Sequence, residues 1–244
     1  MKNSLFVFIL LILSVTSCDF NTQDKTTVTN IDDIVKAILD TSQVYDIIQS
    51  PKYSRADEQY EVISYAQNDT TKLHIENFVS EKREYTRQLY YDNNKLIFLS
   101  ETGYVLTDSS QQEYLNNTYF LGDGTQINYS NKTGFSSEDE NYKLTESVVK
   151  LELNKPFNAI NQKENFEMKF GEFLVMGPQS YLILSNEVSK YDVALYIQQG
   201  DFLLDELFNN PEKYKGKTIF ANHEFINENG ITKMAYRGGM LIGE

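Results

Sequence analysis

The chain has 244 residues, which is enough for one large domain or two small ones. Its 22 lysines and arginines against 35 aspartates and glutamates give a formal net charge of −13, which repels phosphate backbones, so we expect no nucleic-acid partner. A single cysteine excludes an intramolecular disulfide and a zinc site built from several cysteines.

The first predicted element is an apolar N-terminus that ends at the cysteine. Residues 5–13 form an unbroken apolar run after Lys2. This run fits the core of a signal peptide and is too short for a membrane-spanning helix, which needs about 20 residues. The motif Val15-Thr16-Ser17-Cys18 follows, and it resembles the lipobox of bacterial lipoproteins. The resemblance implies that residues 1–17 are a signal peptide and that Cys18 is lipidated.

The lipobox resemblance also implies a location. Two or more acyl chains hold a protein stably on a bilayer, so we expect a lipid-anchored protein of the cell envelope, in the outer membrane. Asp19 leaves the membrane and leaflet open, because an acidic residue directly after the cysteine resembles an inner-membrane retention signal in some bacteria and a surface-export signal in others. Residues 18–28 are then the lipidated cysteine and a flexible, polar tether.

A helix and a β-meander are predicted over residues 29–155. Thr29 is the expected helix cap, and the apolar pattern ends before Pro51. Apolar side chains recur at helical spacing at Ile31, Ile34, Val35, Ile38 and Leu39. From residue 59 the apolar period changes to two, which predicts antiparallel strands behind the helix. We expect about six of them, because the hairpin around residues 84–103 is echoed around residues 113–134.

Turns and loops of this meander are predicted from its Asn and Asp residues. Tight turns are expected at residues 68–70 and 92–95, because Asn tolerates positive φ. The acidic residues 136–141 lack the spacing of a calcium loop and predict a solvated loop. Residues 144–153 fit either a strand or a helix.

A second domain is predicted over residues 165–244. Its pattern gives strands at residues 166–175, 180–185, 191–197, 218–226 and 231–236, with a short helix at residues 202–208. This β-β-β-α-β-β order resembles the OB-fold, a five-stranded barrel, although a small α+β roll has the same order. The resemblance implies ligand binding on the second and third strands. The expected fold class is therefore mainly β (α+β).

The sequence contains no motif for catalysis or metal binding. His74 and His223 lie in separate predicted strands, without a zinc-protease, phosphate-loop or serine-hydrolase motif around them. We interpret both as structural or surface residues. We therefore expect no enzymatic activity, no metal and no cofactor.

Aromatic residues are the candidate binding residues. Exposed tyrosine rings bury a large contact area with few rotatable bonds, although cross-strand packing inside a sheet is the alternative. Arg237, before two glycines, is a candidate anion contact or a strand end. The candidates are Tyr90, Tyr91, Tyr119, Tyr181, Tyr191, Tyr196 and Arg237.

These expectations favour a non-catalytic binding or accessory module for a protein or peptide partner. The OB-like strands carry few basic residues, which favours a peptide over an oligonucleotide. One alternative is an inhibitor or immunity lipoprotein that neutralises a basic hydrolase or toxin. Another is a hydrolase that uses paired carboxylates. The sequence defines no oligomeric state.

Overall fold

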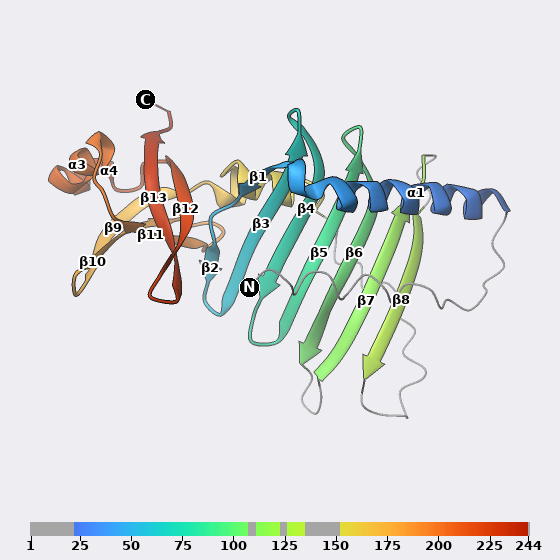
Figure 1. Cartoon of the computed structure of the whole chain (residues 1–244). Coiled ribbons are helices and arrows are strands. Elements are labelled where there is room, and N and C mark those ends of the chain that lie inside the picture. The colour runs from blue at the N-terminus through green and yellow to red at the C-terminus, as the bar shows by residue number, and fades with distance from the viewer. Residues whose placement is uncertain (1–21, 107–110, 123–125, 135–151, 244) are drawn as a thin grey trace.

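Antiparallel strands dominate the chain, as the alternating apolar pattern predicts (Figure 1). The computed structural model describes residues 22–106, 111–122, 126–134 and 152–243. Within these ranges the strands join in one sheet, and they are β1 (Asp46–Gln49), β2 (Tyr53–Arg55), β3 (Glu58–Gln67), β4 (Thr70–Val79), β5 (Arg83–Asp92), β6 (Lys95–Leu106), β7 (Gln111–Phe120), β8 (Gln126–Gly134), β9 (Lys169–Met176), β10 (Gln179–Ser185), β11 (Asp192–Ile197), β12 (Ile219–Glu228) and β13 (Ile231–Leu241). The helices are α1 (Thr22–Thr41), α2 (Lys155–Ile160), α3 (Phe202–Asn209) and α4 (Pro211–Tyr214), with the 3-10 turns η2 (Ser42–Val44) and η3 (Glu164–Phe166). The prediction of a mainly β (α+β) fold is confirmed.

Strands β3 to β8 form the predicted meander, in which each strand pairs antiparallel with the next. The β3–β4 turn has Asn68 and Asp69 at its centre, and the β5–β6 turn has Asn93 and Asn94. All four residues have positive φ, which tight hairpin turns require. The turn residues thus set the register of both hairpins, as their chemistry predicts.

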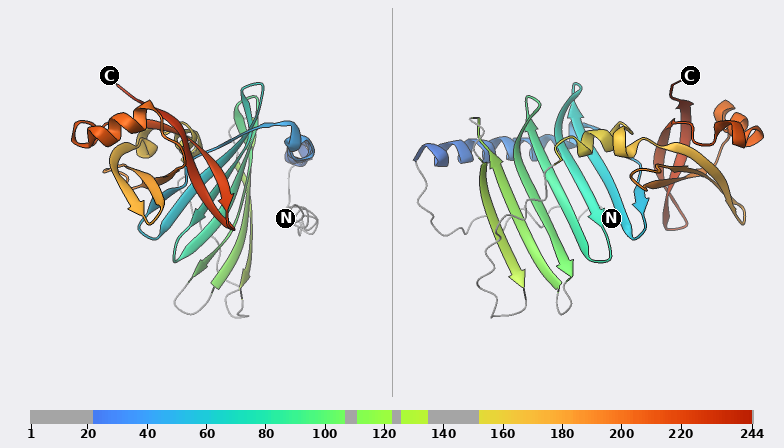
Figure 2. Two further views of the ribbon diagram at one scale, coloured as in Figure 1. Left: turned by 60° about the vertical axis from the view of Figure 1, so that its left-hand side comes forward. Right: turned by 180° about the vertical axis from the view of Figure 1, so that it is seen from behind.

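Helix α1 lies across one face of the meander, and α2 lies on the opposite side of the sheet (Figure 2). Ile31 and Ile38, from the predicted apolar stripe, are buried in a cluster with Leu73, Tyr90 and Phe98. Burying such side chains is the main source of helix stability in a folded protein. The predicted stripe therefore identifies the face of α1 that packs on the sheet.

The predicted bounds of this helix are wrong at both ends. Helix α1 begins at Thr22 rather than near Thr29, so residues 22–28 of the predicted tether are helical. Val28 packs against the buried cluster and extends the stripe by one turn. At the other end, the Thr41 hydroxyl donates to the Ala37 carbonyl at 2.7 Å, a bond that competes with regular helix. The chain then enters β1, which pairs with β3.

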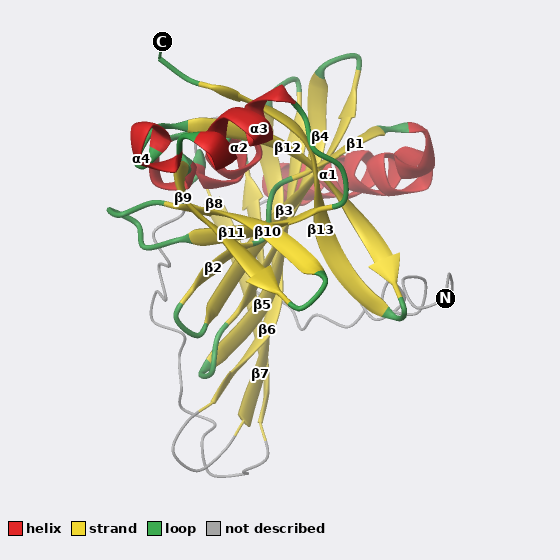
Figure 3. Cartoon of the chain, turned by 90° about the vertical axis from the view of Figure 1, so that its left-hand side faces the viewer, coloured by secondary structure: helices red, strands yellow, loops and turns green. Residues whose placement is uncertain are grey.

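Strands β9 to β13 form the OB-like barrel. Their order is β9-β10-β11-β13-β12, and a bridge between Lys169 and Thr218 returns the start of β12 to β9. Helices α3 and α4 lie at one end of the barrel, and α3 buries Leu204 and Leu207 in its core (Figure 3). The predicted β-β-β-α-β-β order is confirmed. One detail differs, because Pro211, expected to end the helix, begins the short helix α4.

The meander and the barrel share one sheet, and one buried cluster joins β2 and β3 to the barrel. Strand β2 pairs with β3 on one side and with β11 on the other, where Ser54 lies opposite Asp192. The connection expected between the two predicted domains, residues 154–163, contains helix α2, whose Ala159 is buried. The Tyr53 hydroxyl donates to the Ala159 carbonyl at 2.7 Å and ties α2 to β2. The two predicted parts are therefore joined by packed structure.

Several expectations concern residues outside the described ranges: the signal peptide at residues 1–17, lipidated Cys18, the acidic loop at residues 136–141 and most of the ambiguous segment at residues 144–153. Within the described ranges, every helix is too short or too polar to cross a bilayer.

Candidate functional site

A groove runs over the outer face of the OB-like barrel, and we call it the barrel groove. Its volume is about 500 Å³. Its lining residues come from β2, β9, β10, β11 and the segment after α4: Ser54, Gly171, Glu172, Ile183, Ser185, Asp192, Val193, Ala194 and Lys215. Alternation turns Leu182 and Leu184 into the core and Ile183 to the outer face, so the groove lies on the second and third strands of the barrel.

The lining of the barrel groove combines an apolar floor with exposed carboxylates. Ile183 lies opposite Ala194 on one side and Glu172 on the other, so these side chains form one row across three strands. Asp192 lies in the next row, opposite Ser185. Glu172 and Asp192 are exposed, and Lys215 is the one lining cation. Carboxylates beside apolar contacts suit a ligand that carries both positive charge and apolar groups.

Two of the predicted binding residues, Tyr181 and Tyr196, lie side by side next to this groove. They are cross-strand partners on the outer face, and their ring centroids are 5.5 Å apart. The Lys233 ammonium lies 4.4 Å from the centroid of the Tyr196 ring. Val175 and Met176 are exposed at the end of β9, next to the turn that leads to β10. Of the sequence-based candidates on the barrel strands, Tyr181 and Tyr196 therefore share a surface.

Four predicted binding tyrosines are corrected to core residues. Tyr90, Tyr91, Tyr119 and Tyr191 are between 2% and 7% exposed, so little of each ring is open to a partner protein. Helix α1 covers the sheet face that carries Tyr90 and Tyr119, and Tyr91 packs on Phe157 of α2. Cross-strand aromatic packing, the alternative for these positions, is what the structure has.

Arg237 pairs with neighbouring side chains. Its Nε donates to Glu224 Oε2 at 2.8 Å, and one terminal nitrogen donates to Gln198 Oε1 at 3.1 Å. Gly238, which follows it, has a φ of +115°, close to a register shift between β12 and β13. Arg237 therefore marks an irregular strand segment, and Glu224 already neutralises its charge.

A buried ionic network that we did not predict lies on the sheet face opposite α1. Arg87 is cross-strand neighbour to Glu76 on β4 and Glu101 on β6. Its guanidinium donates to Glu76 Oε2 at 2.9 Å and to Glu101 Oε2 at 2.6 and 2.8 Å. All three residues are at most 5% exposed. Both carboxylates are therefore held as the ion-paired partners of one arginine.

Tyrosines and a second arginine complete this network. The Tyr60 hydroxyl donates to Glu76 Oε1 at 2.7 Å, and the Tyr114 hydroxyl donates to Glu101 Oε1 at 2.7 Å. Arg83 donates to Glu101 Oε1 at 2.9 Å. Burial, with Glu101 alongside, raises the pKa of Tyr114 to about 12. In the sequence, this network shows only as charged residues at separate positions of β4, β5 and β6. They can be recognised as partners only when the pairing register of these strands is known.

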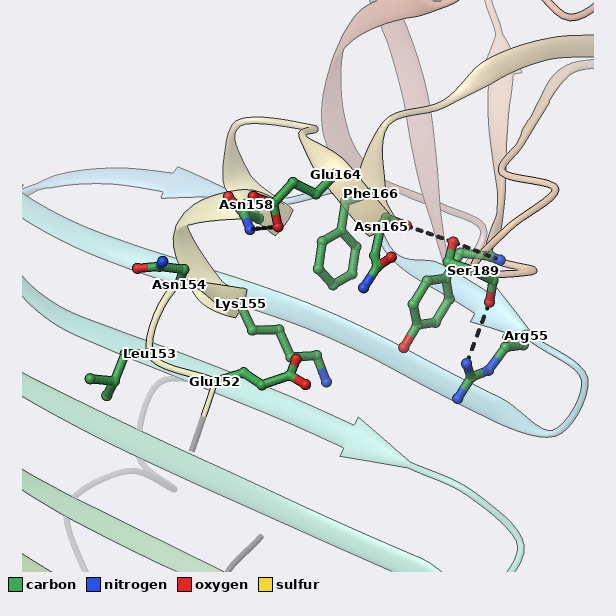
Figure 4. Close-up of a pocket in the computed structure, with 11 residues that line it drawn as sticks. Arg55, Glu152, Leu153, Asn154, Lys155, Asn158, Glu164, Asn165, Phe166 and Ser189 are labelled. Carbon is green, nitrogen blue, oxygen red and sulfur yellow. Dashed lines mark hydrogen bonds between the residues drawn. The ribbon is translucent and has the colours of Figure 1, made fainter. Parts of the chain in front are cut away.

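A second cavity, which we call the junction pocket, lies where α2 meets β2 and the β10–β11 turn (Figure 4). Its volume is about 610 Å³. It is lined by Arg55, Glu152, Leu153, Asn154, Lys155, Asn158, Glu164, Asn165, Phe166, Ser189 and Tyr191. Sequence analysis missed this pocket, because its lining comes from four separate segments of the chain.

The two histidines lie within strands. His74 is buried, and neither of its ring nitrogens has a hydrogen-bond partner among the residues that the structure describes. Its ring packs edge-on against Phe157 at 4.5 Å and Tyr91 at 5.3 Å. Burial lowers the pKa of His74 to about 4 and that of His223 in the same direction. In the described ranges, no three or more histidine, cysteine or acidic side chains gather as a metal site.

The fold and these surfaces define a β-rich α+β protein with a helix-backed meander and an OB-like barrel that carries a groove on its outer face. Comparison of the chain with protein-family models, with curated proteins and with solved structures gives no significant match.

Proposed function

We propose that this protein is a non-catalytic binding module that holds an extended, basic segment of a partner protein or peptide in the barrel groove. The observation that carries the proposal is the apolar pair of Ile183 and Ala194 on the groove floor. The exposed carboxylate of Glu172 lies in the same row, and that of Asp192 lies in the next row. An extended segment places alternate side chains on the groove, where apolar ones meet the floor and basic ones meet the carboxylates.

Two further features support a basic partner. The net charge of −13 attracts a positively charged segment over distances comparable to the Debye length and speeds its encounter with the protein. Beside the groove, Tyr181 and Tyr196 offer aromatic contact area that is already held in place by cross-strand packing. Together they extend the contact surface beyond the groove itself.

The proposal includes anchorage to the cell envelope, in the outer membrane, through lipids on Cys18. It rests on the lipobox resemblance of residues 15–18. Because α1 begins at Thr22, only residues 19–21 separate the helix from the anchor, a span of at most about 14 Å. The binding module would then be held close to the bilayer surface.

The same groove favours one alternative, an inhibitor or immunity lipoprotein that captures a basic hydrolase or toxin. Exposed carboxylates beside a groove suit the basic surface of such a target. The hydrolase alternative gains no comparable support. Glu76 and Glu101, the two buried carboxylates of the described residues, both accept hydrogen bonds from Arg87.

The test is binding of an array of extended octapeptides that differ in basic and apolar content. We expect basic–apolar peptides to bind best and to weaken as salt is raised. The double variant Glu172→Gln/Asp192→Asn should weaken them about five- to tenfold, since each exposed charge contributes up to about 1 kcal/mol. The matched control, Glu113→Gln/Glu212→Gln, removes two exposed carboxylates elsewhere. Equal binding of acidic and basic peptides, or equal losses in both variants, would contradict the proposal.

A further inference from the structure

The junction pocket has the size of a small-molecule site and is separate from the barrel groove. Its volume of about 610 Å³ lies within the range of about 300–1,000 Å³ typical of such sites. Figure 4 shows Lys155 and Glu152 extending from the start of α2, with Asn158 and Glu164 on the α2–η3 side and Arg55 across from them. The lining thus brings both signs of charge around one cavity.

Lys155 is the cation of this pocket that lacks a carboxylate partner. No aspartate or glutamate of the described chain forms an ion pair with it. Its ammonium instead lies 4.0 Å from the centroid of the Tyr60 ring, and burial lowers its pKa. Arg55, the other lining cation, is already paired with Glu58. Glu76 and Glu152 lie near enough to favour the charged form of Lys155, but a ligand carboxylate could form the direct ion pair that no described residue makes with it.

The acidic residues of the pocket are also without cationic partners among the described side chains. Glu164 accepts a hydrogen bond from the Asn158 amide nitrogen at 2.7 Å but forms no ion pair, and neither does Glu152. A purely anionic ligand would meet two carboxylates as well as Lys155. A ligand that carries a carboxylate and an ammonium group matches both signs.

The remaining lining fits the rest of such a ligand. The rings of Phe166 and Tyr191 are stacked, with centroids 5.4 Å apart and an angle of 17° between their planes. Both rings are largely buried, and the small parts that line the cavity can contact an apolar side chain of the ligand. The side-chain amides of Asn154 and Asn165 offer donors and acceptors for peptide groups.

We propose that the junction pocket binds a zwitterionic ligand, a free amino acid or short peptide with an apolar or aromatic side chain. Its carboxylate pairs with Lys155, and its ammonium group pairs with Glu164 or Glu152. The side chain packs on Phe166 and Tyr191. This site is independent of the barrel groove, and the pocket needs no basic partner segment to be occupied.

The test is calorimetric titration of the protein with four forms of phenylalanyl-alanine: free, N-acetylated, C-amidated and blocked at both ends. Free phenylalanine, leucine and alanine are titrated alongside. We expect the free dipeptide to bind and each single block to weaken binding at least tenfold. Phenylalanine should bind more tightly than alanine, because only the larger side chain can contact Phe166 and Tyr191. Equal binding of the four forms, or no binding of any of these ligands, would overturn the proposal.

Two variants separate the two charges. Lys155→Met should weaken the free dipeptide at least tenfold and leave the already weak C-amidated form unchanged, because that form has no carboxylate. Glu164→Gln together with Glu152→Gln should also weaken the free dipeptide at least tenfold. It should leave the already weak N-acetylated form unchanged, because that form has no ammonium group. Lys52→Met, which removes an exposed lysine outside the pocket, is the matched control. Thermal unfolding of each variant checks that it is folded, and equal losses with Lys155→Met and Lys52→Met would refute the assigned role of Lys155.

Discussion

Arg87 holds together charges from three neighbouring strands. Removing it would leave Glu76 buried without a counter-ion and Glu101 with Arg83 alone, and breaking a buried pair in this way costs about 3–5 kcal/mol. We predict that Arg87→Met lowers the free energy of unfolding, measured with urea, by that amount. Arg237→Met is the control, because its partner Glu224 has 62% of its side chain exposed, and should cost at most about 1 kcal/mol. Similar losses in the two variants would contradict the network.

His74 makes stability depend on pH. Its pKa is lowered from 6.5 to about 4 in the folded protein, so protons bind more readily to the unfolded chain between these values. This contribution to stability is present above pH 6.5 and is lost as the pH falls from 6.5 towards 4. We predict that His74→Phe reduces the loss of unfolding free energy between pH 7.5 and 4.5, compared by urea unfolding. Identical pH profiles of the two proteins would show that His74 is not buried in its neutral form.

Which residues face a surface was only partly predictable from the sequence. The OB-fold resemblance pointed to Tyr181 and Tyr196, and these two residues lie together on the outer face of the barrel strands. Alternation reports which side chains share a face. It does not report what covers that face, so Tyr90 and Tyr119, under α1, were mistaken for surface residues. The Arg87 network was invisible for a related reason. It depends on the register between strands, which the sequence pattern alone does not define.

Helix α1 is attached to the meander mainly through its buried isoleucines. Ile38 is 5% exposed and packs in the cluster that contains Leu73 and Phe98. We predict that Ile38→Ala lowers the free energy of unfolding by about 2–5 kcal/mol, because it leaves a cavity between helix and sheet. Lys36→Ala, on the exposed side of the helix, should change it by less than about 0.5 kcal/mol. Chemical unfolding of the two variants measures this difference, and a small loss for Ile38→Ala would mean that α1 is loosely attached.

At the scale of elements, local chemistry predicted most turns and barrel strands. The Asn-rich turns of β3–β4 and β5–β6 and the order of β9 to β13 follow from short-range signals. Strand β1 did not, because the adjacent Ile47 and Ile48 fit the end of a helix as well as a strand. Only pairing with β3 makes this segment extended. The three-residue strand β2 was missed for the same reason, since its pairing partners decide its conformation.

The whole molecule joins two predicted parts through β2, α2 and the buried cluster that spans their junction. Tyr53 and Tyr60 from the meander side pack on Phe166, and Tyr53 also packs on Tyr191. This packing creates the junction pocket, which neither part would form alone. Sequence patterns describe elements one at a time, so a site assembled between elements could not be predicted from them.

The proposed anchor is tested on the whole protein in its bacterial envelope. We predict that the protein incorporates labelled palmitate and sediments with membranes, because two or more acyl chains give stable attachment. The Cys18→Ala variant should carry no label and should lose this attachment. A wild-type protein without label, recovered in the soluble fraction, would contradict the proposed location and leave the groove proposal to be tested separately.

Site-specific photocrosslinking in intact cells tests the central claim most directly. A photoreactive phenylalanine derivative replaces Ile183 in the floor of the barrel groove, and a matched derivative replaces Glu113, which is exposed on β7. The account predicts an adduct with a basic protein or peptide at position 183, absent at position 113 and reduced by Glu172→Gln/Asp192→Asn. No adduct at position 183, or the same adduct at both positions, would contradict it.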